Sequence, residues 1–462
     1  MANFSGPTAR LAAFVASCNT LNVSEDLSQR AGTAMLDAFG LALAAKELLP
    51  WQAFASLTKE LKNPQEGSRV WGRQEYVSVL DAVTANSLAV HARFQDDCDM
   101  TSWAHPGSLI VPPAVSLGEL VGADVATVIR AILCGYATIS WLGGEEVVGR
   151  SVVGRGFRAS PVFGSIGAAA TACVILGLNE KQAHNAIAIA SDNTGGVLEP
   201  VGAGADDWRV QNGTAGHRGV LSALLAQQGV IGAPRALEGP NGFLHTFAGL
   251  DVVPIVWEKD PDLRSILNVW AKPYPTLGDN VAVVSAALAL YELGINSSDI
   301  SNVSVHQNAH FASYPGTSFR GPYERPPQAM ASTAYAVAST LLYGRIDYKR
   351  YTTKLHDEAT NQLISKLTVV PENSYNYIDG EVKVTLSDGT VHSRAAKDLD
   401  QTLFFRDKKS AQEAFMALLN ETGYDAIAGQ KVVDTLFSSI KNADTTKISS
   451  VVDALQFDVV KR

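Results

Sequence analysis

The spacing of apolar residues changes twice along this chain of 462 residues, and this change restricts the fold more than any other feature. Up to about residue 265, apolar side chains recur at helical spacing, as in residues 24–48, among many alanines. Period-two alternation in residues 300–309 and 380–396 then indicates strands, with a hairpin turn at 387–390. Helical spacing returns towards the C-terminus.

This helical, mixed, helical order predicts a mainly α protein with two domains, since the chain is longer than one hydrophobic core usually serves. We place the first part of a helical domain at residues 1–266, a smaller α+β domain at 267–404 and a return to the helical domain at 405–462. Within the first part, residues 68–72 are the one stretch that we predict to be a lone strand.

Charge and cysteine content narrow the classes of function. The formal net charge of −9 argues against nucleic acid and anionic membranes as partners, because both need a basic face. No stretch approaches eighteen uninterrupted apolar residues, so we expect a soluble, cytoplasmic protein with no membrane span. The four cysteines have no C-x-x-C spacing, which favours buried free thiols in a reducing compartment: Cys18, Cys98, Cys134 and Cys173.

The stretch "QDDCDMTSWAHPGS" (95–108) is the densest group of chemically useful side chains. It has one histidine, and Asp97 and Asp99 flank Cys98, so a metal site is the least favoured of three interpretations. The second interpretation is a polar loop that caps a helix starting near Ser108. The third, which these residues favour most, is a proton-transfer site, because a histidine beside carboxylates can titrate near neutral pH.

Two further segments carry polar side chains in constrained backbone. "WAKPYPTLGDN" (270–280) holds Lys272 and Tyr274 among prolines at the expected domain boundary, although a lysine there is more often a surface charge. "DDWRVQNGTAGHRG" (206–219) places Arg209 and Gln211, with glycines, just before a helix whose first N–H groups could meet an anion. A loop followed by a helix cap is the alternative.

Together these segments resemble the MmgE/PrpD family. The likeness covers nearly the whole chain and includes "HARFQDDCDMTSWAHPGSLIVPPAVSLGEL" (91–120), "LEGPNGFLHTF" (237–247), "KPYPT" (272–276) and "ERPPQAMASTAYAVASTLLYG" (324–344). The resemblance implies a large helical domain built from both chain ends, an inserted α+β lid domain and a homodimer that needs no cofactor and no metal. It also implies a small organic acid as substrate.

The sequence departs from the family pattern where that pattern has polar residues. The first aspartate, a histidine, a lysine and a second histidine are replaced, in that order, by Phe94, Arg158, Trp208 and Leu277. The positions that survive are Asp96, Asp97, His105 and Lys272, with Tyr323 as a tyrosine near the R-P step. A buried carboxylate without a partner is very costly, so these changes predict a substrate less polar than citrate-type acids.

We therefore predict a lyase that dehydrates or decarboxylates a carboxylic acid by proton transfer. His105 is the expected general acid or base, Asp97 orients it, and Lys272 stabilises developing charge together with Arg158. The expected substrate-binding residues are Asp96, Arg158, Trp208, Arg209, Tyr274 and Tyr323. An isomerase, epimerase or cyclase using the same pocket and a catalytically inactive family member are the alternatives.

Overall fold

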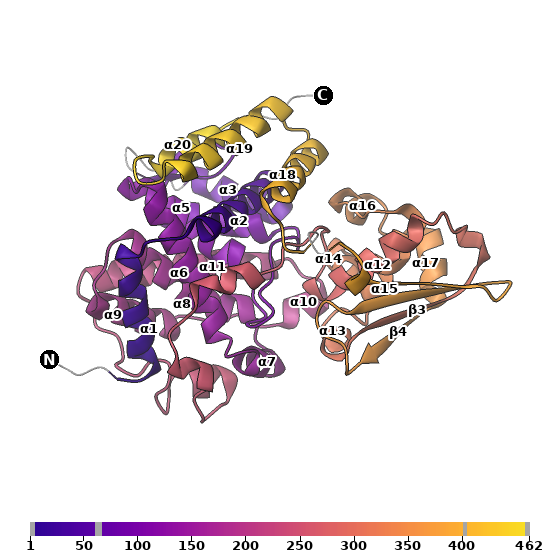
Figure 1. The fold of residues 1–462 in the computed structure, drawn as a ribbon, viewed down its shortest axis with the longest axis horizontal. Helices are drawn as coiled ribbons and strands as arrows, with labels where there is room; N and C mark the ends of the chain where they lie inside the picture. The colour runs from indigo at the N-terminus through magenta and orange to yellow at the C-terminus, as the bar shows by residue number, and fades with distance from the viewer. Residues whose placement is uncertain (1–4, 61–66, 401–403, 458–462) are drawn as a thin grey trace.

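The computed structural model describes residues 5–60, 67–400 and 404–457, and its elements form two regions (Figure 1). The helical region contains α1 (Pro7–Ser17), α2 (Glu25–Ala44), α3 (Leu49–Glu60), α4 (Val79–His91), α5 (Pro106–Val121), α6 (Val125–Leu142), α7 (Val147–Gly154), α8 (Ala159–Ile175), α9 (Glu180–Asp192), α10 (Glu199–Ala203), α11 (Asp207–Gln227), α18 (Lys408–Thr422), α19 (Ala426–Lys441) and α20 (Ile448–Ala454). The mixed region contains α12 (Val281–Tyr291), α13 (Ala309–Ser313), α14 (Pro326–Ala331), α15 (Thr333–Tyr343), α16 (Tyr348–Thr353), α17 (Glu358–Ser365), β3 (Ile300–Asn308), β4 (Leu367–Glu372), β5 (Gly380–Leu386) and β6 (Val391–Ala395). The predicted mainly α class is confirmed.

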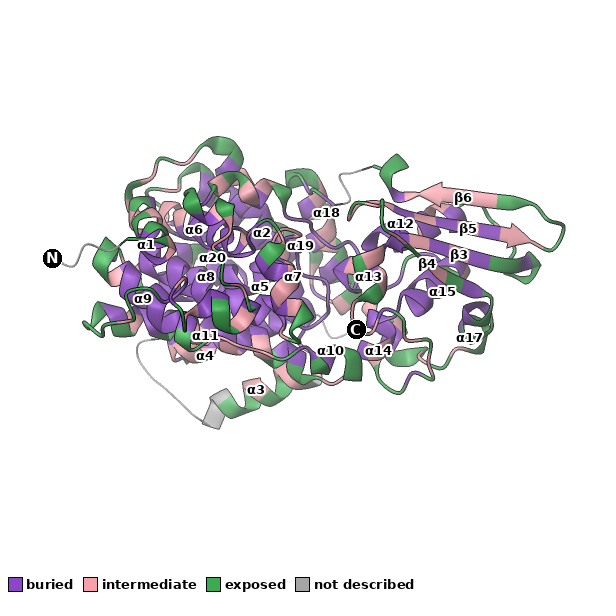
Figure 2. Ribbon diagram, turned by 90° about the horizontal axis from the view of Figure 1, so that it is seen from below, coloured by how far each residue is buried: buried purple, intermediate pink, exposed green. Residues whose placement is uncertain are grey.

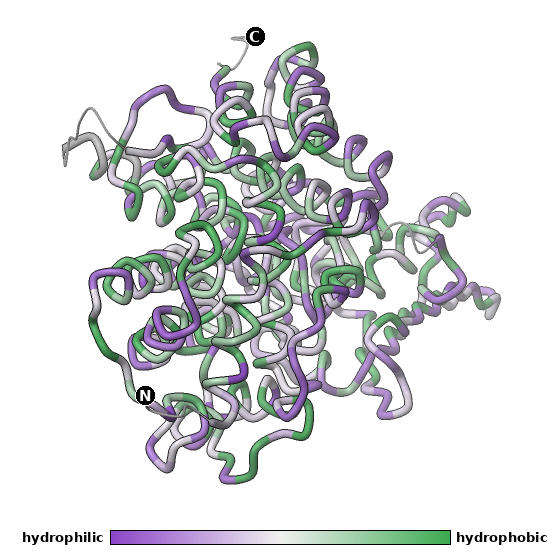
Figure 3. Tube along the Cα trace, turned by 60° about the vertical axis from the view of Figure 1, so that its left-hand side comes forward, coloured by the Kyte–Doolittle hydropathy of each residue, from purple (hydrophilic) through white to green (hydrophobic). Residues whose placement is uncertain are grey.

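The centre of the helical region is α8, in which every residue is buried. Its sequence is apolar or small all the way round, as expected of a helix enclosed by other helices. It packs against α5, α6, α9 and α11, and Figure 2 shows buried residues gathered along these helices. Figure 3 shows hydrophilic segments mostly towards the outside of the molecule. This packing fixes the N-terminal ends of α5, α8 and α11, from which several candidate site residues extend.

The C-terminal helices return to the helical region. Helix α18 packs on α2, and α20 packs on α5, so the yellow helices of Figure 1 lie against the indigo and purple ones. An ion pair of 2.6 Å joins Arg69 Nη1 to Asp453 Oδ1. Residues 401–403, beside the expected boundary at 404, lie outside the described residues, and the exact domain limits stay predictions.

A four-stranded sheet with the order β4-β3-β5-β6 forms the mixed region's flat layer. Strand β3 pairs in parallel with β4 and antiparallel with β5, which in turn pairs antiparallel with β6. Val303 and Val305 on β3 and Val382 and Val384 on β5 are buried, as period-two alternation requires. The strand near 300–309 and the hairpin near 380–396 are thereby confirmed, whereas β4 was not predicted.

Two local predictions are wrong. The stretch at 68–72 is not a lone strand, because β1 (Ser68–Arg69) pairs antiparallel with β2 (Tyr76–Val77). Arg209 and Gln211 do not precede a helix; they lie inside the first turns of α11. The glycines of that helix serve packing: a Cβ at Gly219 would lie 2.5 Å from Ser165 O on α8.

One described helix, α6, is long and apolar enough by composition to cross a membrane, and 78% of that stretch is buried inside the protein. The core helix of a soluble protein meets the same criterion, so this composition is weak evidence for a span.

Candidate active site

His105 lies at the N-cap of α5, at the end of the loop that follows α4. This loop is held by residues 269–276, the crossover segment that leads from the helical region to the mixed region. Cys98 and Trp270 exchange two backbone hydrogen bonds of 2.8 Å, which tie the loop to that segment. At the ends of the loop, Phe94 and Trp103 adopt φ of 55° and 61°. Non-glycine residues in this left-handed conformation are strained and gather at functional sites.

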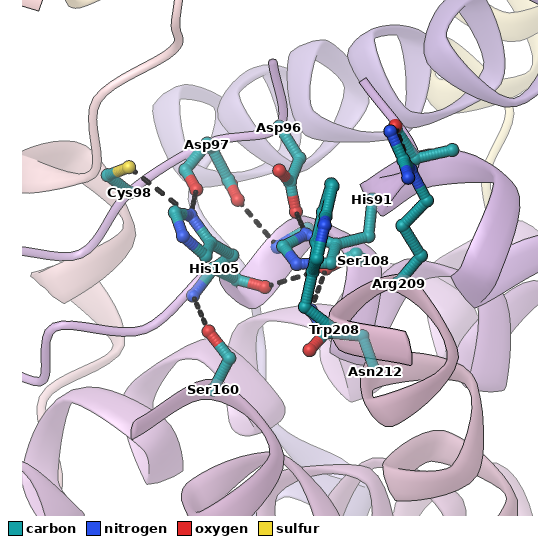
Figure 4. Close-up of polar contacts among 12 residues, drawn as sticks. His91, Asp96, Asp97, Cys98, His105, Ser108, Ser160, Trp208, Arg209 and Asn212 are labelled. Atoms are coloured by element: carbon teal, nitrogen blue, oxygen red, sulfur yellow. Dashed lines mark hydrogen bonds and ion pairs between the residues drawn. The ribbon is translucent and has the colours of Figure 1, made fainter. Parts of the chain in front are cut away.

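The hydrogen bonds of His105 determine which ring nitrogen carries the proton. Its Nδ1 lies 2.7 Å from the carbonyl oxygen of Asp97, and a carbonyl can only accept, so the proton is on Nδ1. Cys98 Sγ is 3.2 Å from the same nitrogen, and the His105 amide donates to Ser160 Oγ (Figure 4). Burial lowers the pKa of His105 to about 3. The imidazole is therefore neutral at neutral pH, with an unprotonated Nε2 that has no hydrogen-bond partner among the described residues.

Asp97 meets His105 through its main chain, while its carboxylate is used elsewhere. Oδ1 accepts the Gly107 amide at 2.7 Å, which caps the first turn of α5, and Oδ2 accepts the Tyr136 hydroxyl at 2.7 Å. Burial raises the pKa of Asp97 to about 7 against these hydrogen bonds. Asp97 thus positions both the histidine ring and the helix that carries it.

Asp96 forms a buried pair with His91, the last residue of α4. Asp96 Oδ2 lies 2.7 Å from His91 Nδ1, and Arg158 Nη2 donates to His91 Nε2 at 2.8 Å. Burial lowers the pKa of His91 to about 4. Burial would raise the pKa of the Asp96 carboxyl, but His91, His105 and the Lys272 ammonium hold it well below its usual range. The pair is therefore a carboxylate and a neutral imidazole.

Arg158 and Lys272 lie on the two sides of this pair. The Arg158 Nη1 donates to Trp208 O at 2.7 Å and to Gln211 Oε1 at 3.0 Å. Lys272 is fully buried, with Nζ 3.9 Å from Asp96 Oδ1 and 3.3 Å from the Thr276 carbonyl. Both cations already have protein partners.

Trp208 and Arg209 also face the protein interior. The Trp208 ring stacks on Phe94 with centroids 3.7 Å apart and meets the His91 ring edge-on at 4.9 Å. Arg209 donates to the Ala92 carbonyl at 2.8 Å and pairs with Asp206. These two residues hold α11 against the end of α4.

Tyr274 and Tyr323 belong to the hydrophobic core of the mixed region. The Arg345 guanidinium lies 6.0 Å from the Tyr274 ring centroid, and the Tyr323 hydroxyl is 2.9 Å from Ser332 Oγ. Neither tyrosine lines the cavity beside His105, but both belong to the same hydrophobic cluster as Phe94, Trp208 and Leu277.

A cavity of about 40 Å³ lies between the two regions, beside His105. The helical region contributes Cys98, Asp99, Met100, Trp103, Ala104 and His105, and the mixed region contributes Leu277, Gly278, Asp279, Phe311 and Tyr314. This lining contains no lysine and no arginine. The volume has room for water but not for an organic acid.

The analysis of the sequence alone missed His91, Asp279 and Tyr314. His91 had a local signal, since it stands five residues before Asp96 in the stretch 91–97. Asp279 lies in the same segment as Lys272, residues 270–280, and resembles a helix cap. Tyr314 lies more than 200 residues from His105 in the sequence, and only the fold brings the two to one cavity. Among the described residues, no group of three or more His, Cys, Asp and Glu side chains could hold a metal ion.

A model of the MmgE/PrpD N-terminal domain matches residues 9–254, more than half of the chain. The chain belongs to the MmgE/PrpD family. It is 25% identical to a cis-aconitate decarboxylase-like protein of Aspergillus oryzae, with 80% of each chain covered. It is 24% identical to a cis-aconitate decarboxylase of Aspergillus terreus, covering 73% of this chain and 72% of the relative. It is 22% identical to the human cis-aconitate decarboxylase, covering 94% and 91%.

The structure shows where this MmgE/PrpD member departs from the family pattern. Leu277 lines the cavity. Arg158, in a histidine's place, holds α8 to α11 and contacts His91. Phe94 and Trp208, in the places of an aspartate and a lysine, stack on each other. Phe94, Trp208 and Leu277 thus place apolar side chains where the pattern has polar ones, and Asp99 is the acidic residue that the helical region contributes to the cavity lining.

Proposed function

We propose that this protein is a lyase that removes carbon dioxide or water from a carboxylic acid carrying fewer charges than citrate-type acids. The observation that carries the proposal is the cavity beside His105, whose Nε2 is unpaired and whose lining contains no lysine or arginine. The names of its relatives, which are cis-aconitate decarboxylases and a decarboxylase-like protein, support the reaction class. His105 Nε2 is the group that accepts or relays a proton at the reacting carbon.

The charge of the cavity supports a less polar substrate. A carboxylate taken from water needs a cation or several donors to offset its desolvation. Lys272 and Arg158 are buried on other partners, so neither is available to three carboxylates at once. Aromatic and aliphatic groups at Trp103, Leu277 and Phe311 instead suit an apolar substituent.

Entry of the substrate requires the two regions to move apart. The cavity is too small for an organic acid, and both regions contribute to its lining. A contact between Arg150 on α7 and Tyr377 of the mixed region, at 2.6 Å, closes the same side. We propose that the mixed region acts as a lid, consistent with the common observation that closure excludes water.

The test uses purified full-length protein in buffered D2O with a panel of acids, followed by proton NMR and by detection of released carbon dioxide. The panel contains cis-aconitate, 2-methylcitrate, iminodisuccinate and alkyl-substituted unsaturated mono- and dicarboxylic acids. We expect the alkyl-substituted acids to lose carbon dioxide or water faster than the tricarboxylates. The variant His105→Gln should abolish turnover, and His217→Gln should not, because His217 is a half-buried residue of α11 that contacts Thr84 and does not line the cavity.

Other results would contradict the proposal. Turnover of the tricarboxylates at ten times the rate of the less charged acids would overturn the substrate class. Exchange of a substrate C–H for deuterium without loss of mass would indicate an isomerase or epimerase instead. Absence of any reaction across the panel would indicate an inactive family member.

A further inference from the structure

Asp279 is the acidic side chain that the mixed region contributes to the cavity. It lies in the single turn Gly278–Asn280 that leads into α12, and this turn lines the cavity together with His105 and Cys98 of the helical region. No hydrogen bond joins its carboxylate to the side chain of another described residue. Asp99, on the same cavity, differs: it accepts hydrogen bonds from Thr101 and Ser102.

We propose that Asp279 is a catalytic residue that donates the proton replacing carbon dioxide on the substrate carbon. This inference rests on the proposed lyase function and assigns one of its steps. The geometry behind it is that Asp279 of the mixed region and His105 of the helical region, whose Nε2 has no partner among the described residues, line the same cavity.

The balance of the reaction requires such a donor. When a carboxylate R–CO2⁻ loses carbon dioxide, the electron pair of the broken C–C bond stays on the substrate. A proton must join that pair to give R–H, and Asp279 becomes a carboxylate that solvent protonates again before the next turnover. In a β,γ-unsaturated acid the pair moves through the double bond, and the proton is added at the far carbon.

The other groups on the cavity are poor sources of this proton. His105 holds its one N–H against the Asp97 carbonyl, and its Nε2 is unprotonated at neutral pH. Burial raises the pKa of the Cys98 thiol and of the Tyr314 hydroxyl well above their usual ranges. Burial raises the pKa of Asp279 to about 7, with the Lys272 ammonium opposing this shift. The charged and titratable groups around Asp279 are Lys272, Cys98 and Tyr314, with His105 and Asp99 on the same cavity. Burial also raises the pKa of Asp99, but its carboxylate is taken up by hydrogen bonds from Thr101 and Ser102. Asp279 is therefore the cavity carboxyl that has no such donors and has a proton to exchange near neutral pH.

The first experiment measures kcat against pH for the wild type, Asp279→Asn and Asp279→Glu, with the best acid from the panel above. We expect kcat of Asp279→Asn to fall about 100-fold or more, because an amide cannot donate as a carboxylic acid does. The decrease in wild-type kcat above about pH 7 should be missing from the residual activity. Asp279→Glu should recover part of the rate. The control is Asp398→Asn, an exposed aspartate of the mixed region, which should match the wild type.

A second measurement separates this inference from the proposed function. In protein labelled with ¹³C at the aspartate carboxyls, the resonance that Asp279→Asn removes should titrate near pH 7. A wild type that turns over no acid in the panel would overturn the lyase function, whatever this titration gives. If the wild type is active, then either an Asp279→Asn rate within threefold of wild type, or an Asp279 carboxyl that is fully ionised above pH 5, would overturn the role of Asp279 alone.

Discussion

The side chains around His91 and those around His105 are neighbours, with ring centroids 5.2 Å apart, but their surroundings differ. His91 is fully buried, and both of its ring nitrogens have partners, Asp96 and Arg158. His105 has one nitrogen held by the Asp97 carbonyl and the other without a partner among the described residues, and the residue lines a cavity. The first group joins α4, α8 and the crossover segment, and the second leaves a nitrogen for a substrate.

This comparison shows that burial of titratable groups does not by itself mark the reacting atoms. Both histidines have lowered pKa values because both are desolvated. Both ring nitrogens of His91 are used by the protein, so this side chain can hold the fold but has little left to offer a substrate. Asp96 Oδ1 accepts no hydrogen bond from the described residues, and the Lys272 ammonium 3.9 Å away balances its charge. We therefore assign the His91, Asp96, Arg158 and Lys272 group to stability and the His105 and Asp279 group to chemistry.

The largest effect on stability is expected from replacing Asp96, a member of the His91 group. Replacing Asp96 by alanine leaves the Lys272 ammonium buried without its carboxylate and removes the partner of His91. We expect Asp96→Ala to lower the free energy of unfolding by about 3–5 kcal/mol, measured by urea titration. The exposed control Asp444→Ala should change it by less than about 0.5 kcal/mol. A stable Asp96→Ala protein would show that this group does not hold the fold.

The next effect is a dependence of stability on pH that comes from His91. Its pKa is about 4 when folded against an ordinary 6.5, so between these values the unfolded chain binds more protons than the folded protein. Stability from this group is therefore lost as pH falls from 6.5 towards 4, by up to about 3 kcal/mol. Asp97, with a pKa of about 7, acts in the opposite direction over part of this range.

The measurement is a comparison of variants, because these opposing groups partly cancel in the wild type. We expect the free energy of unfolding of His91→Gln to fall less between pH 6.5 and 4 than that of the wild type. The exposed control His245→Gln should follow the wild-type curve. Parallel curves for His91→Gln and the wild type would mean that His91 titrates normally in the folded protein.

The smallest effect concerns the aromatic stack beside His91. Phe94→Leu keeps an apolar side chain but loses the stacking contact with Trp208, whose ring centroid lies 3.7 Å away. We expect it to lower the free energy of unfolding by about 1 kcal/mol, while Phe405→Leu, at an exposed ring, should have little effect. A loss of activity in Phe94→Leu without a loss of stability would mean that the stack serves catalysis rather than the stability of the fold.

The fold could be predicted from the sequence because its information is local. The change from helical to period-two spacing marks the mixed region, and the alanine-rich helices of the first part are the ones that pack around α8. The prediction that Arg209 precedes a helix failed because glycines such as Gly219 resemble a loop in sequence. In the structure they allow α11 to approach α8 closely.

The site could be predicted only on one side. His105, Asp97 and Cys98 lie within eight residues of each other, so one stretch of sequence contains them. Asp279, Phe311 and Tyr314 reach the same cavity from the mixed region, and no local pattern links them to His105. The roles of Arg158 and Lys272 also depend on partners distant in sequence. Both cations bind these protein partners, although the sequence pattern predicted that they would bind a substrate.

The most direct test applies the same substitution to the two neighbouring histidines. For His91→Gln and His105→Gln, kcat per folded molecule and the free energy of unfolding are measured side by side. The account predicts that His105→Gln loses kcat by about 100-fold or more while its stability changes by less than about 1 kcal/mol. It predicts that His91→Gln loses about 2–3 kcal/mol of stability and keeps kcat within threefold of wild type. A His91→Gln protein that is stable but inactive, beside an active His105→Gln protein, would contradict the account.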